Sequence, residues 1–123
     1  MRYWLIFAGG GLGAVLRYWV QGLVYNRVGS GFPYGTVVVN IAGCFVIGLL
    51  MVSLEERFLA TPALRLFLTV GILGGFTTFS SFSFETLALF RDGESALALA
   101  NVGFSVLLCL CATWTGMKLG RLV

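Results

Sequence analysis

Four long apolar stretches, separated by short polar segments, dominate the pattern along this chain. They cover residues 3–24, 36–54, 62–90 and 96–117. A helix that spans a bilayer needs about 20 mainly apolar residues, and each stretch reaches that length. None shows the alternation of a membrane β-strand, and backbone polar groups in lipid must be satisfied internally, so helices are expected. The pattern predicts an all-α membrane protein with four transmembrane helices in one domain, residues 1–123.

The third stretch is unusual because polar residues interrupt its middle. The segment "GGFTTFSSFSFE", residues 74–85, contains two glycines, five hydroxyl side chains and four phenylalanines. Glycine costs about 1 kcal/mol relative to alanine inside a helix, and Ser and Thr hydroxyls compete for backbone carbonyls. We therefore expect the third helix to be broken near its middle. Carbonyls freed at such a break can bind a cation, and half-helix N-termini can face an anion.

Composition supports the membrane assignment and excludes several functions. The chain is 59% hydrophobic and 11% charged, whereas a soluble domain is about 25% charged. There is no histidine, and the net charge of +3 is scattered, so neither an enzyme active site nor a nucleic-acid surface is expected. Cys44, Cys109 and Cys111 lie in apolar stretches without C-x-x-C spacing. We expect them to pack as small hydrophobes, not to form a disulfide, zinc or redox site.

The basic residues indicate only a weak preference for one orientation in the membrane. Four helices place both termini on one side. That side carries five Lys or Arg residues and the other three: Arg2, Arg57, Arg65, Lys118 and Arg121 against Arg27, Arg91 and provisionally Arg17. The positive-inside bias is small, so the chain is able to insert in both orientations and pair with itself antiparallel.

Glycines and turn residues mark where helices pack and where they end. Gly-x-x-x-Gly spacing at residues 9–13, 71–75 and 116–120 predicts close helix packing. "GGGLGA" also matches a dinucleotide-binding pattern, but no strand precedes it. Thr61 and Pro62 are typical of a helix start, and "RDGE" predicts a turn.

Several intramembrane side chains are candidates for binding an ion. Phe79 and Phe82, three apart, share a helix face, and the edge of a phenyl ring carries positive partial charge. Asn40 offers amide donors, and Arg17 and Glu85 are ionisable groups inside apolar stretches. Further donors are the hydroxyls of Thr77, Thr78, Ser80, Ser81 and Ser83, and in the last stretch Asn101 and Ser105. Because donors outnumber acids, the set favours an anion. Ordinary packing and interhelical hydrogen bonds explain each residue taken alone.

Three motifs, in order, resemble the Fluc/CrcB family of fluoride channels. "GGGLGAVLRY" resembles the motif of the first helix, "GTVVVNIAGCFVIG" that of the second, and "GGFTTFSSFSFE" the break and phenylalanine pair of the third. The resemblance covers nearly the whole chain. The family more often has threonine at the position of Ser81, where this chain keeps a hydroxyl.

The resemblance implies a passive fluoride channel in the prokaryotic cell membrane, surrounded by lipid. It implies an antiparallel, dual-topology homodimer with two fluoride pores and a central sodium ion. Gly74 and Thr77 would offer backbone carbonyls to the sodium. Residues assigned to the fluoride pore would be Arg17, Asn40, Thr78, Phe79, Ser80, Ser81, Phe82, Ser83, Glu85 and Ser105.

Two other functions remain open from the residues alone. A small multidrug transporter shares the length and the four helices, but it needs an acidic residue in its first helix, and residues 1–54 contain none. A noncatalytic assembly subunit of a membrane complex would not need an intramembrane donor cluster. Flux measured in liposomes distinguishes these functions from a fluoride channel.

Overall fold

The computed structural model describes residues 1–56 and 60–123, which form helices joined by short turns, with no strand in these ranges. In chain order they are α1 (Arg2–Val28), α2 (Tyr34–Glu56), α3 (Pro62–Leu66), the π-helix η1 (Phe67–Leu73), α4 (Gly74–Phe76), α5 (Phe79–Arg91) and α6 (Ser95–Leu122). Helix is present in all four ranges predicted from the sequence, with an interruption in the third, and the all-α prediction is confirmed. Arg57 lies outside the described residues.

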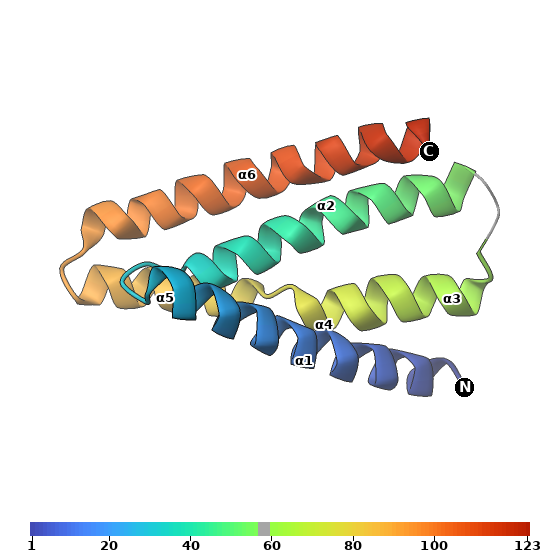
Figure 1. Ribbon diagram of the computed structural model, residues 1–123, viewed down its shortest axis with the longest axis horizontal. Helices are drawn as coiled ribbons and strands as arrows, with labels where there is room; N and C mark the ends of the chain where they lie inside the picture. Colours follow the sequence, from blue (N-terminus) through green and yellow to red (C-terminus); the bar gives the residue numbers. More distant parts are fainter. Residues whose placement is uncertain (57–59) are drawn as a thin grey trace.

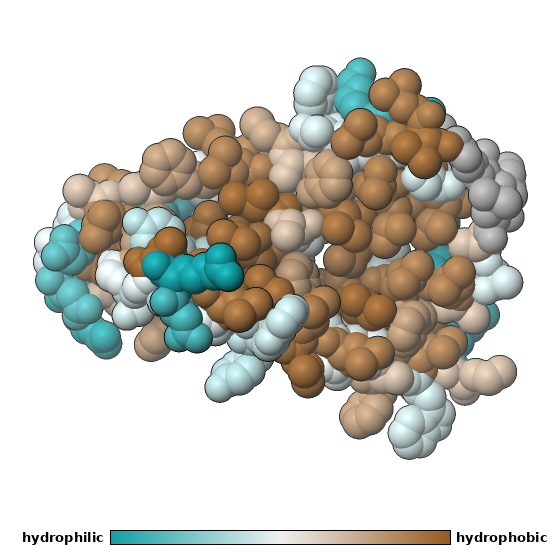
Figure 2. All heavy atoms as spheres, viewed as in Figure 1, coloured by the Kyte–Doolittle hydropathy of each residue, from teal (hydrophilic) through white to brown (hydrophobic). Residues whose placement is uncertain are grey.

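The helices form an elongated bundle with both termini at one end (Figure 1). α3, η1, α4 and α5 follow one another as a single interrupted helix. α1 lies along the first part of it, and α2 and α6 pack together along their lengths. Brown, hydrophobic side chains cover most of the face in Figure 2, while hydrophilic ones gather at the end that carries the α5–α6 turn. This distribution suits a bundle surrounded by lipid.

Three segments of the described chain are long and apolar enough to cross a membrane by length and composition: Tyr34–Glu55, Pro62–Arg91 and Ser95–Leu122. The sequence predicted four. α1 is long enough, with 27 residues, but it is less apolar because it contains Arg17, Gln21 and several glycines. The structure therefore supports three of the four predicted spans on these criteria.

Glycines let α1 lie directly against the interrupted helix. A β-carbon placed on Gly9 would come within 2.9 Å of Gly71 Cα, and one on Gly75 would overlap the carbonyl oxygen of Gly10. On the other side of the bundle, a β-carbon on Gly116 would overlap the carbonyl oxygen of Phe45 in α2. The predicted close packing at all three Gly-x-x-x-Gly pairs is confirmed.

Gly13→Ala is expected to destabilise the fold, because its added methyl group would overlap the carbonyl oxygen of Ile72 and lie 2.8 Å from the backbone nitrogen of Phe76. Overpacking of this kind costs about 1–3 kcal/mol. Gly11→Ala is the matched control, since a β-carbon there meets nothing within 4 Å and alanine favours helix by about 1 kcal/mol. Thermal unfolding in detergent measures both. Equal melting temperatures would contradict the packing seen in the structure.

The connections between helices follow the turn and cap signals of the sequence. Thr61 caps α3, its side chain accepting from the backbone N–H of Leu64 at 3.2 Å, and Pro62 follows as the first helical residue. Gly93 has φ of 81° in the turn before α6, a conformation that favours glycine. Arg65 pairs with Glu55 at 2.8 Å and joins α3 to α2, although this pair is exposed and contributes little to stability.

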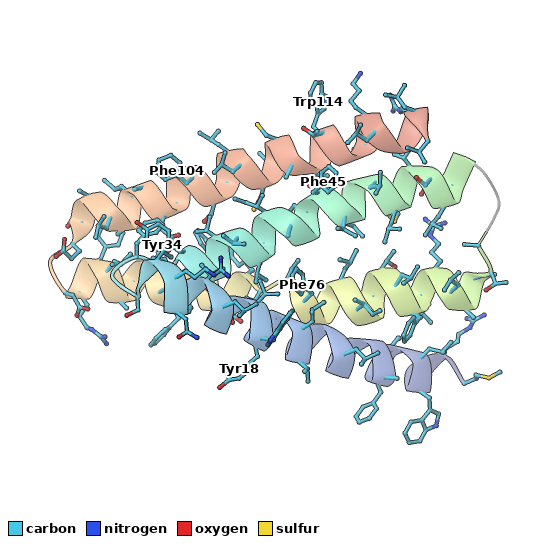
Figure 3. The ribbon with its side chains drawn as sticks, in the orientation of Figure 1. Tyr18, Tyr34, Phe45, Phe76, Phe104 and Trp114 are labelled. Carbon is cyan, nitrogen blue, oxygen red and sulfur yellow. The ribbon has the colours of Figure 1, made fainter. Side chains whose placement is uncertain are left out.

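Aromatic residues show which way the helix faces point. Tyr18 on α1 and Trp114 on α6 project outward in Figure 3, and 81% and 63% of their surfaces are exposed. Such residues are typical of the membrane–water interface. Phe76 instead is buried, and its ring would lie 3.4 Å from a β-carbon on Gly43 of α2. This contact brings α4 against α2 immediately before the interrupted helix opens.

Candidate functional site

The third helix is interrupted at Thr77 and Thr78, which are extended with ψ of 156° and 115°. The predicted break is confirmed near the middle of the segment, but the expectation that Gly74 and Gly75 disrupt the helix is wrong. Both glycines are helical, and Gly75 serves the contact with α1. The helix upstream is also widened into the π-helix η1, which the sequence analysis did not predict.

Asn40 of α2 holds the break open through two hydrogen bonds to one residue. Its Nδ2 donates to the carbonyl of Thr78 at 2.9 Å, and its Oδ1 accepts from the Thr78 backbone N–H at 2.8 Å. The Thr78 N–H therefore does not close a helical turn onto the Gly74 carbonyl four residues earlier. The amide nitrogen carries a second hydrogen. Asn40 thus provides the interhelical bond expected of it and retains a donor for a ligand.

Thr78 also starts the second half of the helix. Its hydroxyl accepts from the backbone N–H of Ser81 at 3.2 Å, which caps α5. The same hydroxyl lies 3.1 Å from the Ser81 hydroxyl and 3.3 Å from that of Ser80. We call the two Asn40–Thr78 hydrogen bonds the Asn40–Thr78 clamp. The clamp and the cap together place three hydroxyl groups at the N-terminus of α5, where the helix dipole favours negative charge.

Phe79 and Phe82 contact each other and line one side of an open cavity. Their ring centroids are 5.3 Å apart and the rings are tilted by 49°, so the predicted shared face is confirmed. Phe79 is 78% exposed, whereas Phe82 is only 9% exposed. The cavity has a volume of about 490 Å³. Other residues lining it include Asn40, Gly74, Thr77, Thr78, Ser105 and Cys44.

A chain of hydrogen bonds fixes the position of Phe82. The Ser105 hydroxyl donates to Asn101 at 3.3 Å, Asn101 donates to Thr86 at 2.8 Å, and Thr86 donates to the Phe82 carbonyl at 2.7 Å. The side chains of Asn101, Ser105 and Thr86 are buried. The sequence analysis singled out Asn101 and Ser105 but missed Thr86. The signal that could have indicated Thr86 is its position one turn after Phe82.

A second hydrogen-bonded group joins α1, α2 and α5 around Glu85. Glu85 Oε1 accepts from the Thr36 hydroxyl at 2.8 Å, and Thr36 accepts from Gln21 Nε2 at 3.1 Å. Glu85 Oε2 is buried and has no partner among the described residues. Gln21 and Thr36 were missed by the sequence analysis. Each lies one turn from a residue that it singled out, Arg17 and Asn40 respectively, and so shares its helix face.

Arg17 lies at the break, whereas Ser83 lies away from the cavity. Arg17 Nη1 donates to the Thr77 carbonyl at 3.4 Å. Ser83 is exposed and does not line the cavity. The structure brings together most of the predicted site residues and leaves Ser83 outside the group.

The break also presents oxygen atoms suited to a hard cation such as sodium. The Gly74 carbonyl does not accept the helical hydrogen bond from the Thr78 N–H, because that N–H donates to Asn40. The Thr77 carbonyl points out of the helix towards the cationic Arg17, and a carbonyl oxygen has a second lone pair. Backbone carbonyls are ordinary ligands of hard cations. Gly74 and Thr77 are thus the residues whose carbonyls would hold the sodium ion that the resemblance implies.

These features define a class: a helical membrane protein whose interrupted third helix is clamped by an asparagine beside a phenylalanine pair. The chain belongs to the family of CrcB-like proteins (Camphor Resistance, CrcB), whose pattern it matches over residues 4–117.

Named relatives agree across almost the full length of the chain. It is 50% identical over 121 residues to the "Fluoride-specific ion channel FluC" of Geotalea daltonii, covering 97% of this chain and 98% of the relative. It is 53% identical over 112 residues to the protein of the same name from Geotalea uraniireducens, covering 91% and 90%. A third, from Solibacter usitatus, is 51% identical over 121 residues, covering 98% and 99%. All three are named as ion channels, which is a non-enzymatic class.

Proposed function

We propose that this protein is a passive, fluoride-selective channel that exports fluoride across the cell membrane. The observation that carries the proposal is the Asn40–Thr78 clamp, which opens the third helix beside Phe79 and Phe82. The choice of fluoride as the transported ion rests on the names of the relatives. They do not favour the multidrug transporter or the assembly subunit.

The arrangement supplies the contacts that a desolvated fluoride ion needs. Fluoride is small and strongly hydrated, so water removed from it must be replaced by other donors. The second amide hydrogen of Asn40, the Ser81 hydroxyl and the positive edges of the two phenyl rings offer such contacts. The Thr78, Ser80 and Ser105 hydroxyls would add to them by turning from their present partners. Arg17 adds positive potential at the break. Weak contacts spread over several sites allow an ion to enter and also to leave.

The ionisable and bridging groups extend this path along the bundle. Glu85 lies one turn beyond Ser81, and its unpartnered Oε2 is buried. The other carboxylate oxygen accepts from the Thr36 hydroxyl, which in turn accepts from Gln21. In this proposal Glu85 borders the ion path and is positioned by α1 and α2. α1 would be the fourth membrane span, since it packs along the interrupted helix over its first half (Figure 1).

Purified protein in liposomes is expected to release fluoride rapidly when potassium is made permeant, and to release chloride at least about a hundredfold more slowly. A fluoride electrode and a chloride electrode measure the two fluxes in matched vesicles. Comparable chloride efflux would contradict selectivity.

Sodium bound by Gly74 and Thr77 predicts that prolonged exchange into a large organic cation lowers the fluoride flux. Unchanged flux and melting temperature after the exchange would remove sodium from the proposal.

The channel is proposed to be an antiparallel homodimer with two pores. The weak charge bias supports dual insertion, and the open cavity beside the break leaves Phe79 exposed in one subunit. A protein lacking native cysteines and carrying Asp92→Cys, in the α5–α6 turn, should label with impermeant thiol reagent from both sides of the membrane in roughly equal parts. Labelling from one side alone would exclude dual topology.

A further inference from the structure

The packing of α2 on α6 brings two cysteines together. The helices run parallel, since a β-carbon on Gly116 would overlap the Phe45 carbonyl and one on Gly120 would lie 2.8 Å from the Leu49 carbonyl. A β-carbon on Gly48 would overlap the Thr113 carbonyl. Cys44 lies one turn before Gly48 on α2, and Cys109 lies one turn before Thr113 on α6. The register of the two helices therefore sets the two cysteines opposite each other.

The two thiols lie close enough to interact. Cys44 and Cys109 are both half-buried and reduced, and both line the cavity beside the break. The third cysteine, Cys111, is exposed and is not part of the cavity wall. A pair of thiols on two rigid helices, open to a cavity, differs from the three separate packing residues that the sequence predicted.

The ligands available decide which metals such a pair can hold. Structural zinc needs four protein ligands, and the described residues contain no group of three or more His, Cys, Asp or Glu side chains that could hold a metal. Soft thiolate ligands select soft cations, and ions such as Cu(I), Ag(I) and Hg(II) accept two thiolates in linear coordination. We propose that Cys44 and Cys109 together form a binding site for a soft, thiophilic metal ion of this class.

Binding at this pair needs no oxidant. Each S–H bond loses its proton to water as a sulfur–metal bond forms, since the thiolate is the metal ligand. The metal charge is balanced by the two thiolates in the case of Hg(II). The bound ion would occupy the cavity that Asn40, Thr78, Phe79 and Phe82 also line. A thiophilic metal therefore blocks fluoride flux, a consequence that rests on the proposed function.

Thiol titration tests the site without any flux measurement. Reduced protein in detergent has three cysteines, and one equivalent of Hg²⁺ should leave one thiol reactive. In Cys111→Ser, the same addition should leave none of the remaining two. Cys44→Ser and Cys109→Ser should each bind Hg²⁺ more weakly by at least about tenfold, measured by competition with a soluble thiol. Two thiols still reactive in Cys111→Ser, or unchanged affinity in both other variants, would overturn the site.

Flux in liposomes tests the consequence. Low concentrations of Hg²⁺ should stop fluoride efflux in the parent and in Cys111→Ser, and inhibition in Cys44→Ser and Cys109→Ser should need at least about tenfold more metal. Each variant is compared with its own flux before metal, and Cys44→Ala and Cys109→Ala replace any serine variant that elutes abnormally. Protection of two thiols with undiminished flux would keep the site and overturn the block. Absence of fluoride flux in untreated parent would instead contradict the proposed function and leave the thiol result standing.

Discussion

Asn40→Asp is expected to reduce fluoride flux by roughly a thousandfold, the largest effect of any single change considered. The new carboxylate keeps an acceptor for the Thr78 N–H but loses the Nδ2 donor to the Thr78 carbonyl. A fluoride ion about 4 Å from this carboxylate would meet about 4 kcal/mol of repulsion at an effective dielectric of about 20, which corresponds to that rate factor.

The electrode assay in liposomes measures the effect, with Asn26→Asp as the control. Asn26 undergoes the same chemical change on an exposed part of α1, so its flux should match the parent. Asn40→Leu separates charge from geometry, because it removes both hydrogen bonds without adding a carboxylate. Parent-like flux in Asn40→Asp would mean that the ion path does not pass this residue.

Phe79→Ile and Phe82→Ile are each expected to lower fluoride flux by roughly tenfold or more. Isoleucine retains an apolar side chain, and such swaps often cost less than about 1.5 kcal/mol of stability, so the protein should elute normally. What is lost is the positive ring edge. A ring-edge contact is worth about 1 kcal/mol, and more in a site of low dielectric.

Phe84→Ile is the matched control for both variants. Phe84 is on the same helix, 69% exposed and outside the cavity wall, so its replacement should leave flux unchanged. Phe82 is buried and Phe79 exposed, so any loss of thermal stability should be confined to Phe82→Ile. Parent-like flux in all three variants would remove ring edges from the mechanism. An equal loss of flux in all three would show a general effect of replacing phenylalanine in α5.

Local signals in the sequence were sufficient to predict the helices, the start of α3 and the faces on which helices pack. Thr61 with Pro62 marks a helix start, and small residues at Gly-x-x-x-Gly spacing identify packing faces whatever their partners are. Phe79 and Phe82 share a face because of their spacing alone. These predictions succeed because they depend on residues within one or two turns of one another.

The remaining features depend on contacts between distant parts of the chain. Thr36 is 49 residues from Glu85, so nothing near Thr36 marks it as a partner of that carboxylate. Arg17 reaches the carbonyl of Thr77 across 60 residues, and no residue near Arg17 in the sequence indicates this partner. The glycines at 74 and 75 were assigned to the break from their helix propensity, but packing against α1 accounts for Gly75.

The clamp by Asn40 means that the interruption of the third helix is a product of assembly between helices. Until α2 is alongside, the Thr78 N–H has no amide to bond, and in lipid an unsatisfied backbone group costs several kcal/mol. The nascent segment Pro62–Arg91 is therefore expected to enter the bilayer as a continuous helix. It opens when helices already inserted associate, the second of the two stages of membrane protein folding. Biogenesis would then yield a closed, inactive chain first, and docking of α2 would complete maturation.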